Sequence, residues 1–288
     1  MDLYDNIELI FMAFAIATIP IYCYISFVLL AERKKVFSSS FYKLFSLLTC
    51  FDILSCFCMI STMTIPSIFF PDEIKDTVLA KIFTGLLLFL RTGQGTATTY
   101  IAVNRATVFI FPLKYIKIWP KRFIFYILIF PCFGLPFLFG IFYADINYIV
   151  EPISGRPFPN FIDTNIRDIL FMIALVMEFY SLVVIFLAYI LVVVKLRKIG
   201  KQLYSNQKTE ENTSTRIAII VCCCEIIYFI FLGLCPIFAI STKTFYAFIN
   251  PVTYVYSTIN CFVLLLFCPP IRDLWKPIKI KNVTTITL

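Results

Sequence analysis

The chain has 288 residues, of which 60% are hydrophobic, and it carries a formal net charge of +8. Its mean hydropathy of +0.90 is too high for a soluble domain, because a fold of this size cannot hide so much apolar surface from water. The composition therefore predicts an integral membrane protein in a lipid bilayer. The positive charge indicates contact with anionic lipid on one membrane face and no nucleic-acid partner.

Seven segments of the chain are long and apolar enough to cross a bilayer, which takes about 20 mainly apolar residues. They lie at about 9–30, 44–68, 82–104, 122–143, 168–194, 217–240 and 246–268. Little chain remains outside them. We therefore expect an all-α membrane protein, a seven-transmembrane helix bundle that forms a single domain over residues 1–288.

The basic residues predict how the bundle is oriented. Most of the 25 Lys and Arg residues lie in the first, third and fifth connections and in the C-terminal tail. Positive charge collects on the cytoplasmic side of membrane proteins, so these segments should lie inside. The N-terminus holds Asp2, Asp5 and Glu8 without a basic side chain, and we expect it outside, with the C-terminus inside.

Four ionisable side chains interrupt the apolar segments: Asp52, Arg91, Glu178 and Glu225. A charge near the bilayer centre costs about 2.5–3.5 kcal/mol on insertion scales, so all four should face the interior and find partners. Depth along the helices favours an Arg91–Glu178 pair across the third and fifth segments, with Asp52 as the competing partner. Such a pair is either a structural contact or part of a ligand site, and the sequence leaves both open.

Polar residues also recur along one face of the third segment, at three- and four-residue steps from Arg91 to Arg105. Weaker polar stripes run along the fifth and seventh segments. Hydrogen bonds between helices would explain many of the hydroxyl groups. As a second possibility, the outer members of these stripes predict a ligand pocket lined by Arg91, Gln94, Glu178, Ser181, Tyr254 and Ser257.

The third segment ends in Asn104-Arg105, and Pro112, Leu113 and Tyr115 follow at fixed spacing. This stretch resembles the Asp-Arg-Tyr region of rhodopsin-like G-protein-coupled receptors, with Asn104 in place of the acidic residue. The resemblance implies that Arg105 contacts a G protein in the active state.

Three other positions resemble switch elements of the same receptors. Asp52 matches the buried acid of the second helix, Asn260 would be its polar partner, and Pro236 matches the kink proline of helix six. The sequence Asn250-Pro251-Val252-Thr253-Tyr254 spells the helix-seven motif of these receptors. However, Asn250 lies about 28 Å along a helix from Pro269, so it should be near the outer face.

A narrower resemblance extends over the whole chain. Phe41-Tyr42-Lys43-Leu44, Asp52-Ile53-Leu54, Asn104-Arg105 and Pro112-Leu113-Lys114-Tyr115 closing on Ile118-Trp119 are similar to nematode serpentine chemoreceptors of the Srg superfamily, class gamma or class V. The resemblance implies a chemosensory receptor in the plasma membrane, on sensory cilia, that signals through a heterotrimeric G protein.

Together these features predict a receptor that binds a small molecule within the bundle and activates a G protein, without a cofactor or metal. An enzyme is not expected, since the chain has no His and no paired nucleophile and base. The alternative is a membrane transporter or ligand-gated channel that uses the buried charges as an ion pathway.

Overall fold

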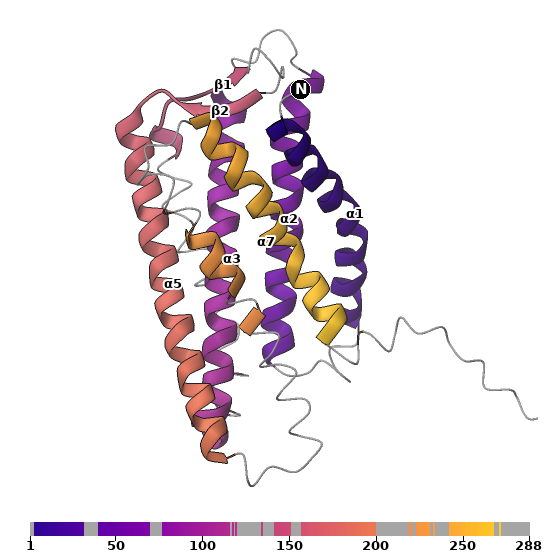
Figure 1. Ribbon diagram of the computed structural model, residues 1–288, viewed down its shortest axis with the longest axis vertical. Helices are drawn as coiled ribbons and strands as arrows, with labels where there is room; N and C mark the ends of the chain where they lie inside the picture. Colours follow the sequence, from indigo (N-terminus) through magenta and orange to yellow (C-terminus); the bar gives the residue numbers. More distant parts are fainter. Residues whose placement is uncertain are drawn as a thin grey trace, which may run out of the picture.

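The computed structural model describes residues 3–31, 40–69, 77–115, 117, 119, 134, 141–150, 157–199, 219–220, 223–230, 233, 242–267 and 271. Within these ranges the long helices are α1 (Leu3–Ala31), α2 (Ser40–Phe69), α3 (Thr77–Ile110), α5 (Thr164–Ile199) and α7 (Thr242–Phe267) (Figure 1). Most of the predicted fourth helix and part of the sixth, including Pro236, lie outside the described residues.

Helix α3 is the central element of the bundle. It packs against α2 and α5, while α1 packs against α2 and α7. Helix α7 crosses α2 and α3 obliquely in Figure 1, whereas α2, α3 and α5 run nearly along the long axis. The N-terminus lies at the same end as the β-strands (Figure 1). Because α3 contacts both α2 and α5, side chains on its different faces contact different helices.

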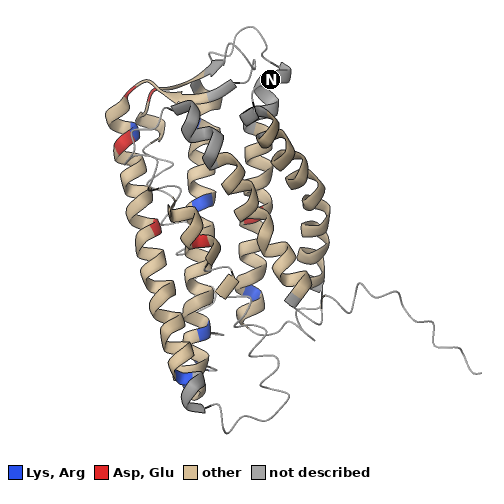
Figure 2. Ribbon diagram, in the orientation of Figure 1, with Lys and Arg blue, Asp and Glu red and all other residues tan. Residues whose placement is uncertain are grey.

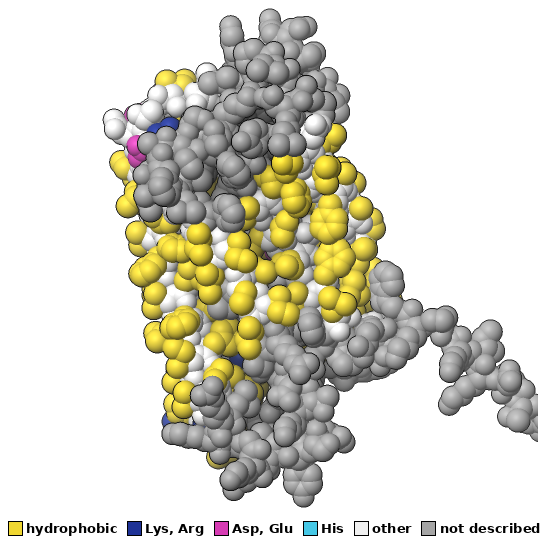
Figure 3. Space-filling view, viewed as in Figure 1, with side chains coloured by type: hydrophobic (Ala, Val, Ile, Leu, Met, Phe, Trp, Pro, Cys, Tyr) yellow, Lys and Arg dark blue, Asp and Glu magenta, His cyan; other side chains and the backbone are white. Residues whose placement is uncertain are grey.

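The outer flanks of the helices carry apolar side chains that no other part of the protein covers. Phe27, Phe57 and Val176 are at least 60% exposed. Hydrophobic side chains cover most of the described flank in Figure 3, and in Figure 2 the charges lie at the ends of the bundle and in a small group at mid-height. Leu9–Leu29, Ser40–Ser61 and Thr164–Lys195 are each long and apolar enough to cross a membrane. This surface fits contact with lipid chains.

An antiparallel hairpin of β1 (Ile146–Val150) and β2 (Pro157–Phe161) covers one end of the bundle. Ile146 pairs with Phe161, and both pack with Ala80 and Leu170. The sequence predicted only a loop for this segment, because prolines such as those of β2 are uncommon within strands. Proline is tolerated in a strand that has a free edge, and β2 pairs only with β1 among the described strands.

Gly93 lets α2 and α3 approach each other closely. A Cβ atom at this position would lie 2.6 Å from Cε1 of Phe51 on α2. We expect Gly93→Ala to lower the free energy of unfolding by about 1–3 kcal/mol, because the Phe51 ring must move within a packed interface. Thermal denaturation of the purified chain in detergent would measure the loss.

The matched control is Gly233→Ala, because the nearest atom to its added Cβ is Cδ1 of Leu175 at 3.7 Å, an ordinary contact. This variant should keep the melting temperature of the unaltered protein. Equal melting temperatures for the two alanine variants would contradict the close packing of α2 on α3.

Candidate ligand cavity and polar networks

A cavity of about 280 Å³ lies between α3 and α5, close to the volume of a site for a small molecule. Pro159 and Phe161 of β2 contribute to its wall, so the hairpin borders it. Its polar wall residues include Arg91, Thr96, Glu178 and Ser181. Three of the six residues predicted for the pocket therefore line it, namely Arg91, Glu178 and Ser181.

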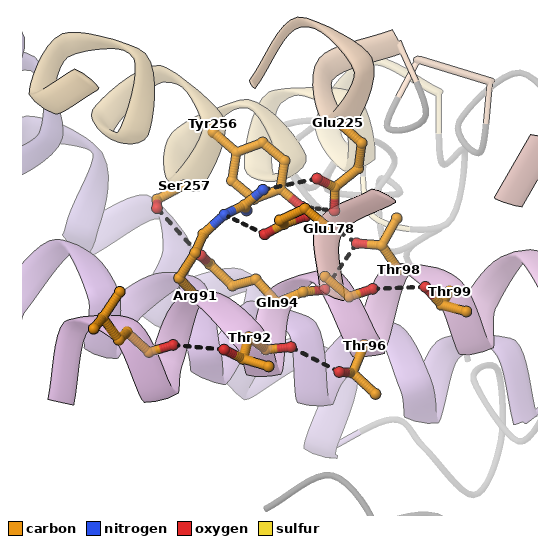
Figure 4. A network of polar contacts seen from close by, with 12 residues as sticks. Arg91, Thr92, Gln94, Thr96, Thr98, Thr99, Glu178, Glu225, Tyr256 and Ser257 are labelled. Carbon is orange, nitrogen blue, oxygen red and sulfur yellow. Dashed lines mark hydrogen bonds and ion pairs between the residues drawn. The ribbon is translucent and has the colours of Figure 1, made fainter. Parts of the chain in front are cut away.

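A buried ion cluster, shown in Figure 4, lies beside this cavity, and two of its members, Arg91 and Glu178, are in the cavity wall. Nε of Arg91 lies 3.1 Å from Oε1 of Glu178, and Nη2 of Arg91 lies 2.8 Å from Oε2 of Glu225. The predicted Arg91–Glu178 contact is thus present, and Asp52 does not take its place. Glu225 is a second partner that the sequence did not predict.

Helix α3 is longer than the predicted segment at both ends. The predicted segment ran over residues 82–104, but α3 begins at Thr77 and ends at Ile110. Arg91 and Glu178 each lie about 21 Å from the N-terminal ends of α3 and α5, near the middle of the bundle. Depth along separate segments was therefore enough to pair Arg91 with Glu178, but it did not identify Glu225 as a second partner.

Two tyrosines complete the surroundings of Arg91. Its Cζ atom lies 3.6 Å from the ring centroid of Tyr228 and 3.9 Å from that of Tyr256, within the range of cation–π contact. The Tyr256 hydroxyl donates a hydrogen bond to Oε1 of Glu225. Both Glu225 oxygens therefore accept hydrogen bonds, one from Tyr256 and the other from Arg91.

A second polar network surrounds Asp52, which is fully buried. Asn260 donates to Oδ2 of Asp52 at 2.9 Å, Gln94 donates to Oδ1 at 2.8 Å, and Tyr22 donates to Oδ2 at 3.1 Å. The Asn260–Asp52 contact expected from the sequence is present. Tyr22 also accepts a hydrogen bond from the backbone N–H of Cys261, so it joins α1 to α7.

This network corrects the predicted pocket. Gln94 donates to Oγ of Ser257 at 3.1 Å as well as to Asp52, and neither residue is in the cavity wall. Tyr254 is also outside the wall, buried against Ala15, Cys56 and Met59. The physical reason is that α7 packs on α1 and α2, which turns this face of the helix toward them.

Other α7 residues line the cavity instead. Asn250 and Thr253 are in its wall. Asn250 therefore lies beside the cavity and not beside the Asp52 network, as its distance from Pro269 indicated. Tyr256 was missed because the polar stripe was followed through Tyr254 and Ser257. The alternative steps, Thr253, Tyr256 and Asn260, are equally helical and would have identified it.

Arg105 lies at the other end of α3, where its Cζ atom is 3.6 Å from the ring centroid of Phe41 on α2. The Asn104 side chain donates to the Tyr115 hydroxyl at 3.5 Å. Pro112 and Leu113 lie on a short helical turn after α3, and both are exposed, Leu113 by 83%. The structure thus places the residues of the Asn104–Tyr115 stretch together, with an aromatic ring beneath the arginine.

Comparisons with known proteins agree on the overall architecture. The crystal structure of squid rhodopsin matches with a TM-score of 0.67 over 92% of this chain and 84% of that chain, at 15% sequence identity. This likeness confirms the predicted seven-transmembrane fold. A search of curated proteins found no match.

A family model described as "Serpentine type 7TM GPCR chemoreceptor Srv" matches residues 11–279. The match covers nearly the whole chain and confirms the predicted serpentine chemoreceptor. It does not test the wider grouping into the Srg superfamily, which stays a prediction. The chain belongs to the Srv family of serpentine seven-transmembrane chemoreceptors.

Proposed function

We propose that this receptor binds a small molecule in the cavity between α3 and α5 and activates a heterotrimeric G protein through Arg105. The observation that carries the proposal is the position of α3. Arg91 of this helix is in the cavity wall, and Arg105 lies about 21 Å further along the same helix, at its other end. One rigid element therefore joins the proposed ligand site to the proposed G-protein site.

The polar contacts between these two sites supply a route for a two-state change. Tyr256 donates to Glu225 and lies 3.4 Å from the Thr98 hydroxyl, while Gln94 links α3 to Asp52 and α7. A ligand that binds one arrangement of these contacts more tightly than the other shifts the population between two bundle states. Pro236 would give helix six a place to bend, which moves its inner end outward and frees Arg105.

The proposal also includes the setting of the receptor. We place it in the plasma membrane of a chemosensory cell, on sensory cilia, with the N-terminus outside and Arg105 on the cytoplasmic face. The basic connections support this orientation, and the exposed turn with Leu113 gives the G protein an apolar contact beside Arg105. We assign the receptor to the Srg superfamily on the residues quoted above.

A ligand screen tests the proposed function. The full chain would be expressed in cells with a G-protein reporter and exposed to a panel of small molecules. We expect ligand responses that disappear when the G protein is removed or inactivated. A ligand-dependent current in membranes without G proteins would contradict the proposal and favour the transporter or channel.

The contact between Arg105 and Phe41 predicts how the resting state is held. Asn104 provides no carboxylate for Arg105, and the guanidinium of Arg105 lies over the Phe41 ring of α2. We expect Phe41→Leu to raise ligand-independent signalling roughly twofold to thirtyfold, because a cation–π contact contributes about 0.5–2 kcal/mol. Basal G-protein activation at matched surface level measures this.

Phe45→Leu is the control for lost packing. Phe45 is buried on the same helix, with its ring centroid 5.8 Å from that of Phe41. This variant should lose stability without the rise in basal activity. An equal rise in both variants would show that loosened packing, and not release of Arg105, causes it.

A further inference from the structure

The ion cluster beside the cavity contains more negative than positive charge. Arg91 carries one positive charge, while Glu178 and Glu225 each supply a carboxylate. The other ion pairs in the described part of the chain, Lys81–Asp145 and Arg167–Asp168, involve surface-exposed carboxylates outside this cluster. With both glutamates ionised, the cluster has one uncompensated negative charge, which is costly in a buried site.

Glu178 is the carboxylate that has capacity left for a ligand. Both oxygens of Glu225 accept hydrogen bonds from the protein, and Glu225 is outside the cavity wall. By contrast, Glu178 is in the wall, and its Oε2 makes no hydrogen bond to another described residue. Its side chain is only 8% exposed. It is therefore a buried acceptor in the wall of the cavity.

Gly95 shapes the space in front of this carboxylate. A Cβ atom on Gly95 would lie 3.4 Å from Oε2 and 3.6 Å from Oε1 of Glu178, and Gly95 is itself in the cavity wall. The absent side chain leaves the carboxylate close to the α3 backbone. The cavity volume of about 280 Å³ is close to that of a site for a small molecule. This is room for a short amine with a ring or an alkyl chain.

An anionic ligand is disfavoured, although Arg91 also lines the cavity. Nη1 of Arg91 is buried and has no hydrogen-bond acceptor among the described residues. An anion placed there would meet two carboxylates already paired with the same guanidinium. Because Arg91 is already paired with two carboxylates, this cavity attracts an anion less than a pocket with an unpaired arginine would.

We propose that the cavity binds small, mainly apolar primary amines, whose ammonium group forms an ion pair with Glu178. This inference rests on the proposed ligand site, and it names the chemical class of the ligand. The ammonium group supplies the positive charge that the cluster lacks, and the apolar remainder packs against wall residues such as Tyr100 and Phe171. An amine and the alcohol of similar shape differ mainly in this charge and in the number of hydrogen-bond donors, so the two can be compared directly.

The test measures binding without a G protein. The purified full chain in lipid nanodiscs would be heated with phenethylamine, phenethyl alcohol or phenylacetate, and with hexylamine, hexanol or hexanoate, each at millimolar concentration. We expect at least one amine to raise the melting temperature. It should bind roughly tenfold to hundredfold more tightly than its alcohol, since a hydrogen bond to a charged group changes affinity by about that factor. Carboxylates should bind least.

Glu178→Gln should abolish the preference for the amine, while Asp168→Asn, which neutralises an exposed carboxylate on the same helix, should keep it. Glu178→Gln leaves Arg91 paired one-to-one with Glu225, so we expect it to fold. If that variant fails to fold, the three-way comparison on the unaltered chain still decides. No amine-specific stabilisation in either series, or preference for the carboxylates, would overturn the inference.

The same experiment separates this inference from the proposed function. Amines that raise the melting temperature but never activate a G protein would support the ligand class and count against the signalling role. Activation of a G protein by neutral compounds that bind as tightly as their amines would support the signalling role and overturn the ligand class.

Discussion

Arg91→Glu should abolish most delivery of the receptor to the cell surface. The substitution places a third carboxylate beside Glu178 and Glu225 and removes the guanidinium that pairs with both. Breaking a single buried ion pair costs about 3–5 kcal/mol, which is comparable to a large part of the total stability of a typical domain. Surface labelling of intact cells and thermal denaturation of the purified chain would measure the loss.

The double reversal Arg91→Glu with Glu178→Arg tests the ion pair itself. It exchanges the two charges and keeps the total charge of the cluster, so surface delivery should recover in part. The matched single control is Arg167→Glu, because Arg167 and its partner Asp168 are surface residues whose contact contributes about 1 kcal/mol or less. A double reversal no better than Arg91→Glu alone would contradict the pairing.

The fold was predictable because its main signal is hydrophobic length, which a bilayer imposes directly on the sequence. The helix ends were less predictable. Helices α3 and α5 continue past the apolar segments, since polar residues at a helix end keep their backbone hydrogen bonds in water as well as in lipid. Helix α3 begins at Thr77 and ends at Ile110, whereas the predicted segment ran over residues 82–104.

The hairpin and the contacts of α7 could not be predicted from the sequence pattern, for a different reason. They depend on how helices rotate and cross, which spacing along one helix does not specify. Tyr254 and Tyr256 are two residues apart and point to different sites, one to α1 and α2 and the other to the ion cluster. The Arg91–Glu178 and Asp52–Asn260 contacts were predictable because buried charged and polar groups need partners at matching depth.

These observations also change the meaning of the charges within the membrane. On sequence alone, Arg91 could serve a ligand or the structure. In the bundle, Arg91 forms ion pairs with Glu178 and Glu225. It also forms cation–π contacts with Tyr228 and Tyr256, so the protein already balances its positive charge. Glu178 remains as the wall residue with an open acceptor. The ligand contact that we expect is therefore the acid of the predicted pair and not the base.

Arg105→Ala should remove G-protein activation while leaving ligand binding and surface delivery nearly unchanged. Arg105 is outside the cavity wall, and its guanidinium lies over the Phe41 ring of α2. Loss of this contact alone would raise basal activity, as we expect for Phe41→Leu. The proposed role at the G protein requires the opposite result, because the guanidinium itself must contact the partner.

Two measurements would test the proposed contact of Arg105 with the G protein. Nucleotide exchange on purified G protein should fall to the level seen without receptor, and the melting-temperature shift given by a cavity ligand should persist. Lys114→Ala is the matched control, since Lys114 is an exposed cation on the turn beside Arg105 and should change exchange by less than about twofold, as a surface charge does. Normal exchange by Arg105→Ala at full surface level would remove the central role of α3, because the cavity would then signal without the residue that this helix places at its far end.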